Sequence, residues 1–146
     1  MIYIRPLIAT DRAEWARMWT SYLDFYETAV AEDVYDIYFD RLLGDDARDF
    51  CCLIALVDGQ PRGLAHYLFH RHGWTIDDTC YLQDLWVDEA ARGTGLGRAL
   101  IEAVYNAADE NGAASTYWLT QDFNFNARQL YDRVGKLTPF IRYNRA

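Results

Sequence analysis

Two stretches in the first third of the chain place apolar residues at helical spacing. In the first, residues 10–27, the apolar positions are Trp15, Met18, Trp19, Tyr22 and Phe25 or Tyr26. Thr10 or Asp11 is suited to cap its N-terminus. The second, residues 32–43, repeats the period and is followed by Gly44, a residue type common just past helix ends. Because this spacing gathers apolar side chains on one face, both stretches predict amphipathic helices.

Shorter apolar runs bounded by turn residues predict strands. Residues 1–7 form one such run. Residues 50–70 contain two runs joined by Asp58-Gly59, a dipeptide typical of a tight hairpin turn. Residues 79–87 supply a further run. We therefore expect one strand at the N-terminus and three consecutive strands in the middle of the chain.

The last third of the chain alternates helix and strand. One predicted helix, ended by Gly112, carries an apolar face of Leu96, Leu100, Ala103, Val104 and Ala107. Residues 115–120 are β-branched and aromatic and predict a strand. Residues 126–134 predict a short helix, with Asn124 or Asn126 as its cap and Gly135 at its end. Residues 139–143 predict a final strand. The order β-α-α-β-β-β-α-β-α-β indicates an α/β protein whose helices pack on a mixed sheet.

The length of 146 residues suffices for one domain, expected to span 1–146, and not for two of ordinary size. No stretch approaches about 18 consecutive apolar residues, and the first residues lack the layout of a secretory signal. We therefore expect a cytoplasmic protein that does not contact membranes. Cys51, Cys52 and Cys80 match neither a disulfide framework nor a zinc spacing, so they predict buried free thiols and no metal site.

The formal net charge of −8 bears on the partner, because phosphate backbones need a basic surface. It argues against nucleic acid and favours cationic ligands. The alternative is that the negative charge only keeps the protein soluble.

The stretch ARGTGLGRAL, residues 90–99, places three glycines at alternate positions between Arg92 and Arg98 and then becomes helical. A glycine turn that enters a helix presents free N–H groups to an anion, and phosphate suits it best. A P-loop would require Gly-Lys-Ser/Thr at the end of the turn, and a dinucleotide fingerprint would require G-x-G-x-x-G, so neither fits. A kinase loop lacks its other motifs. The alternative is a tight turn whose glycines only ease packing.

Two motifs together resemble the GNAT N-acetyltransferase superfamily. The R/Q-x-x-G-x-G/A turn is matched by Arg92, Gly93, Gly95 and Gly97, and N-x-x-A-x-x-x-Y is matched by Asn124, Ala127 and Tyr131. The resemblance is specific over residues 80–143, and the first 75 residues are compatible with it. It looks most like the branch of polyamine, histone and small-amine acetyltransferases. It implies the GNAT fold, a mostly antiparallel sheet with helices on both faces, acetyl-CoA as co-substrate and a possible homodimer.

The resemblance also implies roles for residues that would hold acetyl-CoA. The glycine turn would bind the pyrophosphate, Asn124 the pantetheine arm, and the backbone at Val87 would polarise the thioester carbonyl. The whole implied set is Leu85, Trp86, Val87, Arg92, Gly93, Thr94, Gly95, Leu96, Gly97, Arg98, Asn124, Ala127 and Tyr131. Tyr131 would also act catalytically, as a hydrogen-bond donor to the departing thiolate. The alternative for Tyr131 is a tyrosine of the core.

On the acceptor side, Gln83 and Asp84 stand in the middle of a predicted strand, on opposite faces if side chains alternate. A buried carboxylate is costly unless bonded, so Asp84 is the second candidate catalytic residue: it would take a proton directly or through water, or hold the ammonium. A purely structural Asp84 is the alternative. Related enzymes often have Glu where this chain has Gln83, which leaves the general base open. Further residues expected to line an amine pocket are Tyr22, Tyr26, Glu27, Asp33 and Tyr38. His66 and His70 are expected to be core or surface residues.

These observations lead to an acetyl-CoA-dependent N-acetyltransferase that acts on a primary amine of a cationic small molecule or basic peptide. One alternative is the same fold acting on an amino acid or an antibiotic amine. Another is a non-catalytic acyl-CoA-binding module, because fold alone does not imply activity.

Overall fold

The structure is a computed structural model that describes residues 1–146. Its strands are β1 (Ile2–Pro6), β2 (Cys51–Val57), β3 (Gln60–His70), β4 (Thr79–Val87) and β5 (Ser115–Tyr117). Its helices are α1 (Arg12–Phe25), α2 (Glu32–Leu43), α3 (Leu96–Glu110) and α4 (Phe125–Val134), with short 3-10 turns at Ala9–Asp11 and Glu89–Ala91. The two N-terminal helices, the hairpin and the helix after the glycines thus lie where the apolar pattern predicts them.

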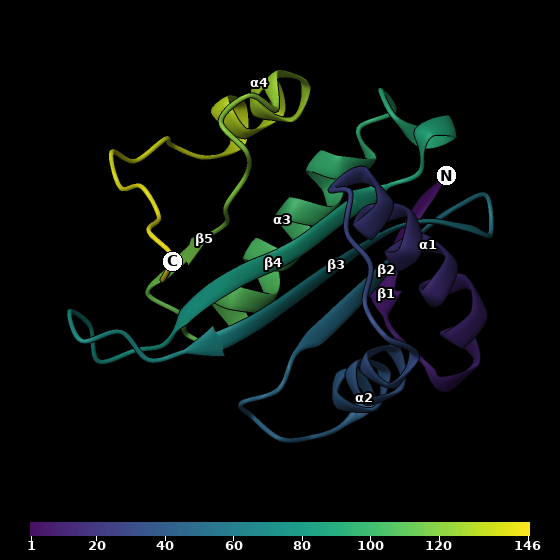
Figure 1. Cartoon of the computed structure of the whole chain (residues 1–146), viewed down its shortest axis with the longest axis horizontal. Helices are drawn as coiled ribbons and strands as arrows, with labels where there is room; N and C mark the ends of the chain where they lie inside the picture. The colour runs from purple at the N-terminus through teal and green to yellow at the C-terminus, as the bar shows by residue number, and fades with distance from the viewer.

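The five strands form one sheet in the order β1-β2-β3-β4-β5. The first four are antiparallel neighbours, whereas β5 is parallel to β4. These two strands pair only from Thr79 to Tyr81, and beyond that point they diverge (Figure 1). The divergence opens the sheet between the second half of β4 and the chain that follows β5.

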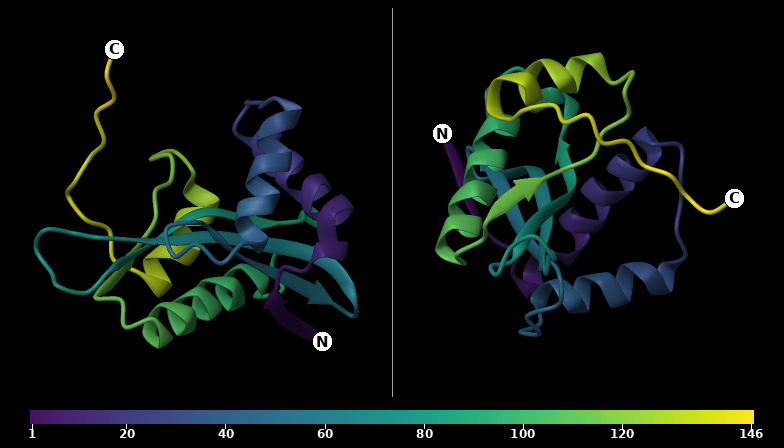
Figure 2. Two further views of the ribbon diagram at one scale, coloured as in Figure 1. Left: turned by 90° about the horizontal axis from the view of Figure 1, so that it is seen from below. Right: turned by 90° about the vertical axis from the view of Figure 1, so that its left-hand side faces the viewer.

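Helices cover both faces of the sheet, as expected for the fold. Figure 2 shows α1 and α2 on one face and α3 on the other. Trp15, Ile54 and Leu64 belong to the core under α1 and α2. Leu100 and Ile101 of α3 belong to the core on the opposite face. None of the helices has the length and apolar character needed to cross a membrane.

A β-bulge in β4 changes which face its side chains occupy. His66 of β3 pairs with Asp84, but the next residue, Tyr67, pairs with Leu82, so Gln83 has no partner. As a result Leu82 and Leu85 both pack into the α3 core, although they are three positions apart. Asp84 turns to the α1 and α2 face, where it meets His66. The bulge inserts one extra residue and so interrupts the alternation of side chains between the two faces of the sheet. The expectation that Gln83 and Asp84 alternate regularly is therefore wrong.

The predicted strand at 139–143 is not formed. No backbone hydrogen bond joins residues 136–146 to the rest of the chain, and all of them are exposed. The predicted strand at 115–120 ends at Tyr117 because β4 has diverged from it. A strand forms only where another strand can pair with it, whatever its propensity. Residues 118–120 and 139–143 have no such partner strand.

Candidate active site

The glycine turn joins β4 to α3, and two of its glycines have left-handed backbone conformations. Gly93 has φ 77° and Gly95 has φ 86°, a region that strongly favours glycine. A Cβ atom at either position would meet nothing within 4 Å. These two glycines are therefore required by the path of the backbone, not by close packing.

The third glycine lets α4 approach the start of α3. A Cβ atom on Gly97 would lie 3.2 Å from Cδ2 of Leu130 and 3.8 Å from Cγ2 of Val87. Even an alanine would press against α4. Gly97 thus brings α4 close to the turn.

The first turn of α3 is suited to bind an anion. Its first backbone bond runs from the Ala99 N–H to the Gly95 carbonyl, so the N–H groups of Leu96, Gly97 and Arg98 have no backbone acceptor. Free N–H groups at a helix N-terminus attract negative charge. Arg98 adds a cation beside them; its Nε lies 2.8 Å from the Glu102 carboxylate.

Arg92, the arginine at the start of the turn, lies against the end of β4. Its guanidinium stacks 5.0 Å from the centre of the Trp86 ring. Its Nε donates a hydrogen bond to the Val87 carbonyl at 3.1 Å. Arg92 therefore contributes positive charge to the turn and also covers the last residues of β4.

One cleft of about 590 Å³ runs from the glycine turn to the diverging strands, within the size range of small-molecule sites. Of the residues implied to bind acetyl-CoA, it is lined by Leu85, Trp86, Val87, Arg92, Gly93, Gly95, Leu96, Gly97, Arg98, Asn124, Ala127 and Tyr131. The exception is Thr94, whose hydroxyl donates to the Ala91 carbonyl at 2.5 Å. The fold thus brings together in one cleft two motifs that are far apart in the sequence.

The second half of β4 presents to this cleft a backbone edge that no other strand pairs with. The N–H of Asp88 donates to the Arg62 carbonyl at 2.7 Å, and successive residues of a strand point their backbone groups to alternate edges. The N–H and carbonyl of Val87, and likewise of Leu85, therefore point away from β3 and toward the cleft. A peptide-like ligand can form strand-type hydrogen bonds there.

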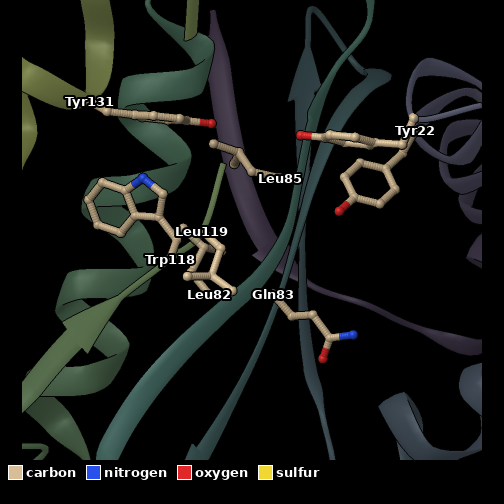
Figure 3. A pocket seen from close by; sticks show the side chains of 8 residues that line it. Tyr22, Leu82, Gln83, Leu85, Trp118, Leu119 and Tyr131 are labelled. Carbon is tan, nitrogen blue, oxygen red and sulfur yellow. The ribbon is translucent and has the colours of Figure 1, made fainter. Parts of the chain in front are cut away.

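Tyr131 stands at the inner end of the cleft, where a narrow pocket opens between α1, β4 and the chain after β5. Figure 3 shows Tyr131 on one side and Tyr22 on the other, with Leu82 and Leu85 of β4 between them. Trp118 and Leu119 complete the wall. Burial raises the pKa of Tyr131 to about 12, so the phenol keeps its proton at neutral pH. Asn124, at the N-cap position of α4, donates from Nδ2 to the Thr120 hydroxyl at 3.3 Å.

Asp84 lies next to this pocket without lining it. It is 5% exposed and is bonded to two side chains. Its Oδ2 lies 2.8 Å from Nδ1 of His66 and accepts a hydrogen bond from the Tyr38 hydroxyl at 3.0 Å. Burial opposes ionisation, but the hydrogen bonds from His66 and Tyr38 hold the pKa of Asp84 below its ordinary value. Asp84 is therefore a stable anion behind the pocket wall, held by side chains and not by backbone.

The other residues expected around an amine pocket divide into two groups. Tyr22 and Tyr26 line both the pocket and the cleft. The other three line neither: Glu27 and Asp33 are exposed, and Tyr38 is buried. Gln83 lines the pocket and in Figure 3 points away from Leu82 and Leu85. No group of His, Cys, Asp and Glu side chains is arranged to hold a metal ion.

Sequence reasoning missed the contribution of His66 and Trp15. The Trp15 indole N–H donates to Nε2 of His66 at 2.9 Å, and His66 in turn contacts Asp84. The strand register offers a signal, since His66 stands opposite Asp84. The bulge at Gln83 conceals that register from any count of alternating positions.

Comparison with known proteins connects this geometry to a family. The profile of the Acetyltransferase (GNAT) family matches residues 15–135. The chain is 34% identical over 145 residues to the D-amino-acid N-acetyltransferase HPA3 of Saccharomyces cerevisiae, covering 99% of this chain and 90% of that protein. It is 28% identical over 81 residues to a thialysine N-epsilon-acetyltransferase of Caenorhabditis elegans, covering 56% of this chain and 50% of that protein.

Solved structures share the fold at low sequence identity. The aminoglycoside acetyltransferase AAC(6')-Iy, in complex with a bisubstrate analogue, superposes with a TM-score of 0.84 at 18% identity, covering 100% of this chain and 98% of that one. A ribosomal-protein-alanine N-acetyltransferase of Brucella melitensis superposes with a TM-score of 0.78 at 23% identity, covering 100% and 99%. The family profile covers most of the chain, and the architecture agrees with it. The chain therefore belongs to the GNAT family of N-acetyltransferases.

Proposed function

We propose that this N-acetyltransferase moves the acetyl group of acetyl-CoA to a primary amine of a small cationic acceptor, by direct attack with both substrates bound. The observation that carries the proposal is the single cleft that joins the anion-binding turn at Gly95 to the pocket at Tyr131 and Tyr22. Such a cleft accommodates the diphosphate at one end and the thioester at the other. Holding both substrates together supplies much of the rate enhancement.

In the reaction the amine nitrogen attacks the thioester carbonyl carbon, a C–N bond forms and the C–S bond breaks. The backbone N–H of Val87 donates to the carbonyl oxygen as negative charge develops on it. The departing sulfur keeps the electron pair and accepts a hydrogen bond from the Tyr131 hydroxyl. With its pKa at about 12, Tyr131 is a weaker acid than a thiol of pKa about 8.5, so full proton transfer is uphill by about 5 kcal/mol. The final proton on sulfur balances the one lost by the amine and comes through solvent.

Asp84 serves the acceptor side by its charge, not as a proton acceptor. An alkylammonium has a pKa of about 10.4, whereas the pKa of Asp84 lies below its ordinary value. A carboxylate this acidic is a very weak base toward an ammonium group, but its negative charge attracts a cation. The negative net charge of −8 acts in the same direction at longer range.

The amino group of an amino acid is the second candidate acceptor, and the similarity to the yeast D-amino-acid acetyltransferase favours it. No arginine or lysine lines the inner pocket, so no side chain there can pair with the carboxylate of an amino acid. This favours an amine acceptor that has no carboxylate. Thiol release measured with diamines, monoamines and D- and L-amino acids decides between them. Absence of thiol release with every amine, together with tight acetyl-CoA binding, would support an acyl-CoA-binding module instead.

Tyr131→Phe tests the mechanism. We expect kcat to fall at least about tenfold, the effect of losing one charge-assisted hydrogen bond in the transition state, while the Kd for acetyl-CoA stays within about twofold. Tyr105→Phe is the matched control, because its hydroxyl donates to the Val134 carbonyl at 2.7 Å and lies outside the cleft. Equal kcat in Tyr131→Phe and the native chain would remove Tyr131 from the mechanism.

A further inference from the structure

The inner pocket beside Tyr131 is very small and mostly apolar. Its volume is about 20 Å³, against about 590 Å³ for the cleft that leads to it. A water molecule requires about 10–15 Å³ of such space, so the pocket has room for one group close to that size. A methyl group is of that order, whereas an ethyl group exceeds it. The apolar side chains of the pocket are Leu82, Leu85, Trp118 and Leu119.

The β-bulge in β4 builds one wall of this pocket. Because Gln83 has no partner in β3, Leu82 and Leu85 lie on the same face of the sheet and belong to the same core cluster. Leu82 is buried at 2% exposure. Protein cores are close-packed, so this wall does not recede to admit a larger ligand.

Trp118 forms a second wall, and its ring is held on both sides. It follows β5 directly, and its ring centroid lies 5.5 Å from that of Tyr131 on α4 and 6.2 Å from that of Tyr105 on α3. A Cβ atom on Gly135 would lie 2.8 Å from Cη2 and 3.1 Å from Cζ2 of the indole, so the ring fits only because residue 135 is glycine. In Figure 3 Trp118 lies on the same side of the pocket as Tyr131, opposite Tyr22. These contacts fix the indole beside the pocket.

The pocket adjoins the place where the proposed function puts the thioester. Leu85 and Tyr131 line both the cleft and the inner pocket. With the sulfur at Tyr131, the carbon chain beyond the carbonyl would enter the space that Leu85 and Trp118 enclose. Tyr22 and Gln83 provide polar groups to the pocket, where an amine can approach. The apolar walls therefore surround the acyl group and not the acceptor.

We propose that Trp118 determines the length of the acyl group that is transferred, limiting it to the two carbons of acetyl, and that Gly135 is a positioning residue for the Trp118 ring. The inference rests on the proposed function and narrows its acyl donor. Propionyl and butyryl groups are rejected by the size of the inner pocket. A smaller side chain at Trp118 admits them to the same reaction, in which the C–N bond forms, the C–S bond breaks and CoA leaves as the thiol.

Rates with acetyl-CoA, propionyl-CoA and butyryl-CoA test this limit, with one amine as the common acceptor. One methylene in a fitted pocket changes specificity by about 10–200-fold, so we expect the native chain to prefer acetyl-CoA over propionyl-CoA at least about tenfold in kcat/KM. Trp118→Ala, and the milder Trp118→Leu, which keeps an apolar side chain against Tyr131, should remove most of this preference. Trp74→Ala is the control, because Trp74 is 84% exposed and lies outside the pocket. An unchanged preference in both Trp118 variants, or none in the native chain, would overturn the limit.

Gly135→Ala tests the positioning role. Its Cβ would displace the indole, so we expect the ring N–H resonance of Trp118 to shift and the preference between acetyl-CoA and propionyl-CoA to change. Trp118→Phe is the matched background, because phenylalanine has no atoms equivalent to Cη2 and Cζ2. There, addition of Gly135→Ala should leave the preference unaltered. A shifted resonance with unchanged preference would overturn the role of Gly135.

Binding measurements separate this inference from the proposed function. Calorimetry should show that the native chain binds butyryl-CoA at least about tenfold more weakly than acetyl-CoA, and that Trp118→Ala narrows the ratio. If the ratio is found but no amine is acetylated, the proposed function fails and the limit set by Trp118 stands. If amines accept acetyl, propionyl and butyryl groups at equal rates, the limit fails and the acyl transfer stands.

Discussion

Arg17 of α1 and Asp88 at the end of β4 form an ion pair, with Nη2 and Oδ2 2.9 Å apart. Asp88 also accepts a hydrogen bond from the Trp86 indole N–H at 2.9 Å and is 8% exposed. Through these bonds one carboxylate ties the helix layer to the strand end from which the glycine turn leaves.

Asp88→Ala should therefore lower the free energy of unfolding by about 1–3 kcal/mol, because it leaves the Trp86 indole N–H without its acceptor and removes the link from β4 to Arg17, which keeps Glu14 and the Pro61 carbonyl as partners. Urea denaturation measures the change. Glu102→Gln is the control: it breaks the exposed Arg98–Glu102 pair and should change stability by less than about 1 kcal/mol. If the two variants lose the same amount, Asp88 does not fasten β4 to α1.

Gly93→Ala and Gly95→Ala should each weaken acetyl-CoA binding and destabilise the fold by about 1–2 kcal/mol, because alanine is strained at φ 77° and φ 86°. Calorimetry and thermal unfolding measure the two effects. Gly73→Ala provides the comparison, since a Cβ there meets nothing within 4 Å and its φ is not in the left-handed region. Tight binding by Gly93→Ala would contradict the need for this turn.

Gly97→Ala is expected to act differently, through packing. Its Cβ would meet Cδ2 of Leu130 at 3.2 Å, so the Leu130 side chain must move by a few tenths of an ångström, and we expect part of this displacement to reach Tyr131 on the same helix. We expect a lower kcat with a smaller loss of stability than at Gly93, and partial recovery in the double variant with Leu130→Ala, which removes the clashing methyl groups. A double variant no better than Gly97→Ala would argue against the contact.

Acid should weaken the fold partly through Asp11. Arg5 donates to both carboxylate oxygens of Asp11, at 2.7 and 2.9 Å, and this bonding lowers the pKa of Asp11 below 3.8. A depressed pKa contributes stability above the unfolded value, and that contribution is lost as pH falls through the folded pKa. Asp11→Asn should thus be less stable than the native chain at neutral pH, and the difference should shrink as the pH falls below about 4, the ordinary pKa of an aspartate. If the stability difference between Asp11→Asn and the native chain did not change with pH, the charge of Asp11 would not be its cause.

The reaction rate at alkaline pH tests whether Tyr131 keeps its proton. Because burial raises its pKa to about 12, the phenol stays protonated while an acceptor amine of pKa about 10.4 loses its proton. The rate should therefore rise with pH up to about pH 10, with no decline from ionisation of Tyr131. A fall in kcat below that pH, absent in Tyr131→Phe, would show that the tyrosine ionises earlier.

The parts of the site that sequence predicted are those with local causes. Gly93 and Gly95 follow from backbone conformation, and Ala127 and Tyr131 from a local motif through which the chain resembles the GNAT family. Thr94 shows the limit, since its place within the motif gave no hint that its hydroxyl bonds Ala91. On the acceptor side, the position of Asp84 depends on the bulge at Gln83, and the spacing of apolar residues does not reveal a bulge.

The surroundings of Asp84 were harder to predict because they are assembled from four separate elements. His66, Trp15 and Tyr38 come from β3, α1 and α2, and only their packing makes them neighbours. The segment at 139–143 has the composition of a strand, yet a strand needs an adjacent edge, and its own chain leaves it without one.

The short pairing of β4 with β5 leaves a strand edge that, in the proposed function, the coenzyme would cover. Past Tyr81 no strand pairs with that side of β4. Arg92 bonds the Val87 carbonyl there, and in the proposed function the pantetheine arm would bond the remaining backbone groups of this edge. Any ligand that binds only the folded state adds to its stability, and the gain grows with ligand supply. If the coenzyme binds as proposed, the resistance of this protein to heating should thus rise with the level of its acyl donor.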